Sequence, residues 1–347
     1  MRVLVLTHRD LLPPPGARAR PDGARTVPWA TEQDVLEGLR RLGHEAVAVG
    51  LCRSLAPLRA ALRRHRPQAV LNLLEEFGDR TERVAEVVAW LVRQGLPVTG
   101  CHAPALRRAH HKGRARRALR KAGVPVPHGV AVPRARRLRA ALRLPWPRVV
   151  KSATRHGSEG LTQASIVTSE RAQAAQLRHI QRDVGTDALV EQYVEGRELY
   201  VGVLGGRALP PCELQRARGA AGPWIASART KWDPAYRSAH GMAYEPARRL
   251  PAAGARRVAR VAVAAARALG IEAAARIDLR LAPDGQPWVI EANPNPDLGA
   301  WGEFAAGAAR HGLPYEALLA RLLADARRRS RGRRSGQHRI LLGHVRT

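Results

Sequence analysis

The sequence predicts an N-terminal doubly wound (Rossmann-like) α/β domain followed by a two-lobed α+β module. Three observations predict it. Strand and helix patterns alternate over residues 1–104, whereas strand patterns dominate after residue 105. The chain of 347 residues, 45% of them hydrophobic, is also too long for one typical domain. We therefore expect an N-terminal domain at 1–104, a central lobe at 105–189 and a C-terminal lobe at 190–326.

The first domain begins with an apolar run at 3–7, which is typical of a buried strand. An amphipathic helix follows, with Thr31 as its predicted N-cap and Gly43 as its stop after Leu42. A long loop at 11–28 separates the two, at the place where doubly wound folds bind ligands. The remaining elements are strands at 45–50, 68–74 and 97–100 and helices at 54–65 and 81–95.

The second half opens with a basic helix at 104–122, ended by Gly123, on whose surface we expect His110 and His111. A second helix is predicted at 251–270 and a closing helix at 315–329. The basic segment 327–347 is predicted to be a disordered tail. Strands are predicted at 147–153, 164–167, 187–194, 198–206 and 207–214, and as a hairpin of 274–281 with 287–294.

The net charge of +30 suggests a nucleic-acid partner, but its composition argues against that interpretation. Only four of the 59 basic residues are lysine, and asparagine is almost as rare, while Ala, Arg, Gly and Pro abound. These abundant residues have GC-rich codons, so most of the arginine is attributed to base composition. The few lysines and asparagines are therefore candidates for functional roles. They lie at Lys112, Lys121, Lys151, Lys231, Asn72, Asn293 and Asn295.

Cysteine usage and the apolar runs favour a cytoplasmic protein. Cys52, Cys101 and Cys212 are far apart, with no CxxC pair, which fits a reducing compartment. The apolar run at the start is too short for a signal peptide, and no stretch approaches the 18 or more apolar residues of a membrane span.

The predicted hairpin carries two carboxylates. If Asp284 and Gly285 form a two-residue turn, Asp278 lies opposite Glu291, and Arg276 lies opposite Asn293 on the same face. Like charges in this position repel unless a divalent cation lies between them, and Mg²⁺ prefers such oxygen ligands. An exposed face whose charges are satisfied by arginines is an equally weighted alternative. The opposite, apolar face would carry Ile277, Leu279, Ile290 and Ala292, and the arginines would be Arg276 and Arg280.

Two further segments have polar residues in a pattern typical of nucleotide binding. A strand ending in Lys151 runs into a loop with Ser158 and Gly160, where small residues let backbone N–H groups approach phosphate. A plain strand-to-strand turn is the alternative. The apolar strand around Glu191 is followed by Glu198, and its alternative is an ordinary amphipathic strand.

Taken in order, these segments resemble the ATP-grasp superfamily and, within it, the D-alanine–D-alanine ligase family. The resemblance extends to about residue 325, and its most specific part is RID at 276–278 with EANPNP at 291–296. It implies an enzyme that binds ATP and Mg²⁺, or alternatively Mn²⁺, between two α+β lobes. It also implies a homodimer, and a reaction in which a carboxylate becomes an acyl phosphate that an amine attacks to form an amide.

The resemblance also implies roles for single residues. Arg276 and Lys231 would be catalytic, with Lys231 reaching the γ-phosphate and Arg276 stabilising charge in the transition state. Asp278, Glu291 and Asn293 would hold the metal. The nucleotide would be bound at its phosphates, adenine and ribose by Lys112, Lys151, Ser158, Gly160, Glu191, Val194 and Glu198.

The chain departs from the family at the substrate end. Thr26 stands where the family has a glutamate for an amino group, and Glu32 is out of register. Glu75-Glu76 replaces a His-Gly pair, and it either binds a cationic amine or forms a solvent-facing loop. We therefore expect an amino acid or peptide substrate other than D-alanyl-D-alanine precursors, with a peptide-tailoring ligase as one form of this. The alternative from another class is a non-catalytic scaffold that binds nucleic acid or an acidic partner through its basic tail.

Overall fold

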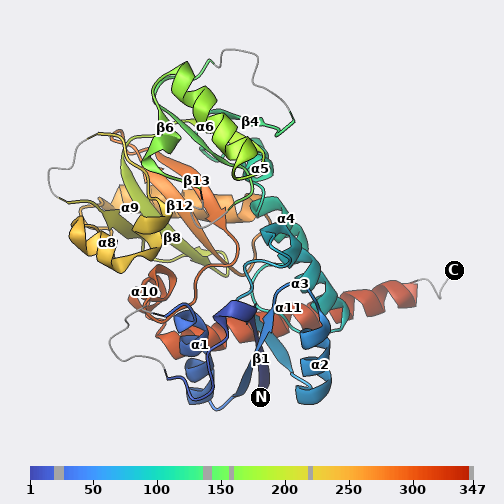
Figure 1. Ribbon diagram of the computed structural model, residues 1–347. Helices are drawn as coiled ribbons and strands as arrows, with labels where there is room; N and C mark the ends of the chain where they lie inside the picture. Colours follow the sequence, from blue (N-terminus) through green and yellow to red (C-terminus); the bar gives the residue numbers. More distant parts are fainter. Residues whose placement is uncertain (19–26, 136–142, 156–159, 218–221, 344–347) are drawn as a thin grey trace.

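The computed structural model describes residues 1–18, 27–135, 143–155, 160–217 and 222–343. Of Trp232, Pro234 and 333–343 it describes the backbone alone. Figure 1 shows three parts: an N-terminal domain, a central lobe at the top, and a C-terminal lobe beside it. The predicted fold class, a doubly wound domain followed by two α+β lobes, is confirmed.

The N-terminal domain is built on a parallel sheet of order β2-β1-β3. The predicted fourth strand at 97–100 is reduced to a single bridge between Val98 and Val70. Along the chain, helices alternate with these strands, as the sequence pattern predicts. The elements are β1 (Arg2–His8), α1 (Ala30–Arg41), β2 (Glu45–Leu51), α2 (Ala56–His65), β3 (Ala69–Asn72) and α3 (Val84–Arg93).

The central lobe is an antiparallel sheet of order β4-β7-β5-β6. The predicted basic helix at 104–122 is in fact two helices, because the helical conformation is interrupted at His110 and His111. The His110 side chain is buried, with Nδ1 3.1 Å from the Thr81 carbonyl oxygen, rather than on the helix surface. His111 is the N-cap of the second helix. The elements are α4 (Ala103–Ala109), α5 (Lys112–Lys121), β4 (Gly129–Val132), β5 (Arg148–Ser152), β6 (Ile166–Val167), the unpredicted α6 (Glu170–Arg182) and β7 (Ala188–Gln192).

The C-terminal lobe is an antiparallel sheet of order β11-β10-β8-β12-β13, with β9 beside β8. Helix α9 packs its apolar side on this sheet, where Val258 and Ala262 join Ile277 and Leu279 in one buried cluster. The opposite face of β12 therefore presents its polar residues to the central lobe. The elements are β8 (Arg197–Leu204), β9 (Arg207–Ala208), β10 (Cys212–Gln215), α7 (Ala228–Trp232), α8 (Pro234–Ala239), β11 (Ala243–Pro246), α9 (Ala252–Ala268), β12 (Ala274–Leu281), β13 (Pro287–Asn293) and α10 (Glu303–Arg310).

The β12–β13 hairpin turns through three residues, not the two that the sequence predicted. The Ala282 N–H donates to the Gln286 carbonyl oxygen, and the Gly285 N–H donates to the Ala282 carbonyl oxygen. Gly285 takes φ of +78°, a left-handed conformation that suits glycine. This turn alone would place Asp278 opposite Ile290. A register shift between Asp278 and Leu279 adds one residue and restores the pairing of Asp278 with Glu291. The predicted pairing is thus correct because two deviations cancel.

The last helix, α11 (Tyr315–Gly343), returns to the N-terminal domain. Leu319 and Leu322 join Val3, Val5 and Leu39 in a buried cluster, so α11 and α1 together cover one face of the first sheet. The predicted lobe at 190–326 therefore ends in a helix that belongs structurally to the first domain. The predicted disordered tail is wrong for 327–343, where α11 continues and projects from the body (Figure 1). Arg, Leu and Ala favour helix, and extending an anchored helix needs no new nucleus.

None of the helices in the described ranges has both the length and the apolar composition to cross a membrane.

We predict that Leu319→Ala lowers the free energy of unfolding by about 2–5 kcal/mol, because a fully buried leucine leaves a cavity. Arg321→Ala, on the exposed side of the same turn, should change it by less than about 1 kcal/mol. Urea unfolding of the two variants tests this. Equal stability of both variants would contradict the packing of α11 on the N-terminal sheet.

Candidate active site

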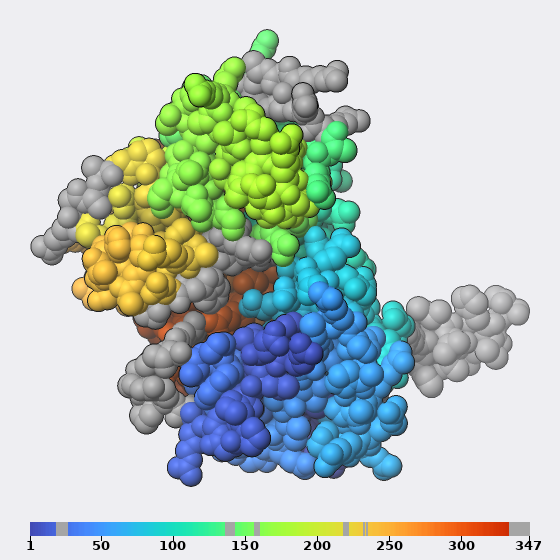
Figure 2. All heavy atoms as spheres, in the orientation of Figure 1, coloured from blue at the N-terminus to red at the C-terminus, as the bar shows by residue number. Residues whose placement is uncertain are grey.

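One pocket between the central and C-terminal sheets gathers most of the predicted site. Its walls come from β5, β7, β12 and β13 and from the segment before α7. Figure 2 shows the central lobe and the C-terminal lobe as adjoining masses, with the N-terminal domain below them. Of the predicted residues, those lining the pocket are Lys112, Lys151, Glu191, Val194, Glu198, Lys231, Asp278 and Glu291.

Asp278 and Glu291 face each other across the hairpin, as predicted, and each has a cationic partner of its own. Arg276 donates to both oxygens of Asp278 at 2.8 and 3.1 Å, and Lys231 Nζ lies 3.4 Å from Asp278 Oδ2. Lys112 Nζ lies 3.0 Å from Glu291 Oε1. Asp278 is only 3% exposed, so the alternative of a solvent-facing hairpin surface is wrong.

These side chains suit a hard divalent cation. Two carboxylates and an amide provide the oxygen donors that Mg²⁺ prefers, while phosphate and water complete its usual shell. Asn293 pairs with Arg276 in the register, and its Oδ1 accepts a hydrogen bond from the Asn295 N–H at 3.0 Å. The described part of the chain contains no group of three or more His, Cys, Asp or Glu side chains that could hold a metal ion.

Three lysines from three separate segments converge on the same side of the pocket. Lys112 is the first residue of α5, Lys151 lies on β5, and Lys231 lies on α7. Burial lowers the pKa of Lys112, and the charges of Lys151 and Lys231 lower it further, while Glu291 acts in the opposite direction. Cations this close together repel one another, and a polyanion such as a phosphate chain would relieve that repulsion.

Glu191 occupies the floor of the pocket as the anchor of two cations. Its Oε2 lies 2.6 Å from Lys151 Nζ, and its other oxygen contacts Arg116. At 3% exposure, the carboxylate holds Lys151 in place, a role that the sequence did not indicate. Gly160 has φ of +70° and is absent from the pocket lining, while Ser158 lies outside the described residues.

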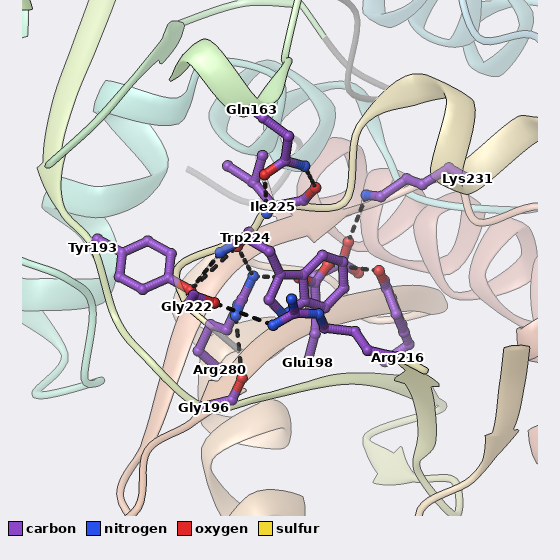
Figure 3. Close-up of polar contacts among 12 residues, drawn as sticks. Gln163, Tyr193, Gly196, Glu198, Arg216, Gly222, Trp224, Ile225, Lys231 and Arg280 are labelled. Carbon is purple, nitrogen blue, oxygen red and sulfur yellow. Dashed lines mark hydrogen bonds and ion pairs between the residues drawn. The ribbon is translucent and has the colours of Figure 1, made fainter. Parts of the chain in front are cut away.

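Part of the pocket lining is apolar, and we call this part the slot. Val194 lines it together with Ile225 and Ile290, neither of which the sequence indicated. Ile290 was predicted on the opposite, α9-covered face, but the register shift in the hairpin turns it into the pocket. Arg280, interpreted from sequence as one of the cations of an exposed face, is 4% exposed and also lines this slot (Figure 3).

The face of the first domain toward the hairpin carries acidic side chains. Glu32 on α1 is 3% exposed and accepts a hydrogen bond from Thr7 Oγ1 at 2.6 Å. Thr31, predicted as the cap of α1, instead donates to Asp297 Oδ1 at 2.8 Å. Thr26 lies outside the described residues.

Glu75 shares this acidic environment. The residue is exposed, yet desolvation by the surrounding protein raises the pKa of its carboxyl to about 7. Asp297 and Glu32 add to the increase, whereas Arg276 opposes it. Glu76 instead contacts His8, with its Oε1 3.8 Å from His8 Nε2.

Comparison with known proteins decides the family. A family model described as the D-ala D-ala ligase C-terminus matches residues 119–324. The chain belongs to the D-alanine–D-alanine ligase-like family of ATP-grasp ligases. It is 33% identical over 307 residues to the D-alanine–D-alanine ligase of Anaeromyxobacter sp. (strain Fw109-5), covering 87% of this chain and 92% of that protein. It is 29% identical over 303 residues to that of Gluconobacter oxydans (strain 621H), covering 87% and 95%.

The solved structures extend the family's fold to the first domain. The ligase from Bacillus anthracis complexed with ATP has a TM-score of 0.73 and 19% identity, and the alignment covers 96% of this chain and 99% of that one. At this identity the match establishes the ligase fold.

Glu75→Gln should make stability less dependent on pH. The folded-state pKa of Glu75 is raised, so its ionisation destabilises the fold, and this loss appears as pH rises from about 4.5 to about 7. The variant should match the parent near pH 4.5 and melt at a higher temperature at pH 8. Thermal unfolding across that range measures the difference, and Glu76→Gln serves as the matched neighbour. A difference that stays constant with pH would contradict the raised pKa.

Proposed function

We propose that the protein is an ATP-dependent, ADP-forming carboxylate–amine ligase that uses Mg²⁺, with Mn²⁺ as an alternative. The observation that carries the proposal is the shared pocket, in which three lysines, two opposed carboxylates and an apolar slot meet. A phosphate chain, a divalent cation and a purine ring match these features in that order. Family membership, and the ATP bound to the Bacillus anthracis relative, support the same assignment.

Nucleotide binding would exchange the partners of the charged side chains. Lys112 and Lys231 now neutralise Glu291 and Asp278. When ATP enters, these lysines and Lys151 would turn to phosphate oxygens, because an anionic phosphate can replace a carboxylate as their partner. Mg²⁺, held by Asp278, Glu291 and Asn293, would neutralise charge on the phosphates when bound.

Amide formation would proceed in two displacements. A substrate carboxylate oxygen attacks the γ-phosphorus, the bond to the β-phosphate oxygen breaks, and ADP leaves with that electron pair. The amine nitrogen of the second substrate then attacks the acyl carbon, phosphate leaves, and the ammonium proton passes to solvent. Arg276, 14% exposed in its side chain and aligned with Asp278, would stabilise the oxyanion that forms. The pocket between the sheets would shield the acyl phosphate from water.

The proposal includes an amino acid or peptide substrate pair other than two D-alanines. Glu75 supports it, since its carboxyl is near enough to Arg276 for their charges to interact, and the resemblance would place a histidine-glycine pair at Glu75-Glu76. Glu32 and Asp297, close to Glu75, provide further negative charge that suits a cationic amine. A homodimer and a cytoplasmic location stay predictions of the sequence.

The test is ADP release from Mg-ATP with pools of amino acids and dipeptides. We expect release that depends on one pool, and a loss of at least about 100-fold in Glu291→Gln, since the metal that would neutralise transition-state charge loses a charged ligand. Glu245→Gln, on β11 of the same sheet and outside the pocket, should retain activity. Release that Glu291→Gln leaves intact, or no release from any pool, would contradict the proposed ligase.

A further inference from the structure

A buried guanidinium lies at the slot end of the pocket, away from the three lysines. Arg280 follows Arg276 and Asp278 on the same face of β12, at alternate positions. It is 4% exposed, and its neighbours include neither carboxylate of the metal site. Burying an ion removes its hydration, which costs several kcal/mol unless partners replace the water. The partners of Arg280 therefore indicate its structural role.

Arg280 holds three acceptors at once, as Figure 3 shows. Its Nη2 lies 2.8 Å from Glu198 Oε2 and 2.8 Å from the Trp224 carbonyl oxygen, and Nη1 donates to the Gly196 carbonyl oxygen at 3.1 Å. The guanidinium also lies over the rings of Trp224 and Tyr193, 5.0 and 5.6 Å from their centroids. The planar fork reaches acceptors on different sides from several nitrogen atoms, whereas the three donors of an ammonium radiate from a single nitrogen.

The first consequence is a fixed orientation of the Glu198 carboxylate. Arg280 binds Oε2, and the Tyr200 hydroxyl donates to Oε1 at 2.6 Å, so both oxygens are held. Each oxygen keeps a lone pair for another donor. A carboxylate held at both oxygens, at the edge of an apolar slot, suits a pair of neighbouring hydroxyl groups.

The second consequence is a fixed wall for the slot. Tyr193 and Gln163 of the central lobe bracket the segment at Trp224 and Ile225. The Trp224 N–H donates to the Tyr193 hydroxyl at 3.0 Å, and Gln163 Nε2 donates to the Ile225 carbonyl oxygen at 2.7 Å. Arg280 binds the same segment from the C-terminal lobe. It thus connects the wall, the Glu198 carboxylate and the turn at Gly196.

We propose that Arg280 is a positioning residue that sets a preference for nucleotides with both ribose hydroxyls. It acts by holding Glu198 toward the sugar and by fixing the wall beside it. This inference rests on the proposed function, since it presumes that ATP occupies the pocket. Arg280 shares no partner with the three lysines, since the guanidinium binds Glu198 and the carbonyl oxygens of Gly196 and Trp224.

Equilibrium binding of Mg-ATP, 2′-deoxy-ATP and 3′-deoxy-ATP tests the inference without knowledge of the substrates. We expect the parent to bind ATP at least about 10-fold more tightly than either deoxynucleotide, the effect of one hydrogen bond to a charged group. Arg280→Met should weaken binding of ATP, which has both hydroxyls, at least about 10-fold more than binding of either deoxynucleotide, which keeps one. The discrimination ratio would therefore approach one. Equal weakening of all three nucleotides, or an unchanged ratio, would overturn the proposal.

Two further variants make the result independent of the folding of Arg280→Met. Arg280→Lys keeps the buried charge but replaces the planar fork with donors on a single nitrogen atom, so it should also lose most of the discrimination. Glu198→Gln should lose it as well, and adding Arg280→Lys to Glu198→Gln should lower the ratio no further. If the parent itself does not bind Mg-ATP, the proposed function fails. If it binds ATP and Arg280→Lys keeps the parent ratio, only the role of Arg280 fails.

Discussion

The opposition of Asp278 and Glu291 across the β12–β13 hairpin is the constraint on which the site depends. Two carboxylates in this position repel, and burial strengthens the repulsion. The protein balances them with Arg276, Lys231 and Lys112, each within 3.4 Å of a carboxylate oxygen. The same cations match a phosphate chain, and the same carboxylates match a divalent metal. The site therefore holds in direct contact the two charge sets that Mg-ATP would separate.

This balance requires cations from distant parts of the chain. The break between α4 and α5 at His110 places Lys112 at a helix start, and β5 contributes Lys151 from the facing sheet. The two lobes are thus joined by ion pairs across the pocket as well as by the Gln163 and Tyr193 contacts at the slot. These contacts lie in the same pocket that we propose for the nucleotide.

The sequence predicted the elements of the site better than their geometry. Alternation along β12 is a local property, so the shared face of Arg276 and Asp278 followed from it. The pairing of Asp278 with Glu291 was correct although the turn was not, because the bulge compensates. The positions of Ile290 and Arg280 in the pocket lining were not predicted. A β-bulge, which turns Ile290, has no clear sequence signal, and one arginine does not stand out in a chain so rich in arginine. The packing of α11 on the first sheet joins residues far apart in the sequence, and local sequence patterns cannot predict such contacts.

The most direct test of the opposed carboxylates is binding of Mn²⁺, followed by electron paramagnetic resonance, with a non-hydrolysable ATP analogue present. The account predicts that Asp278→Asn and Glu291→Gln each weaken Mn²⁺ binding by at least about 10-fold, since each removes a charged oxygen ligand. Glu245→Gln should bind Mn²⁺ as the parent does. Unchanged Mn²⁺ affinity in both hairpin variants would contradict the claim that this pair holds the metal.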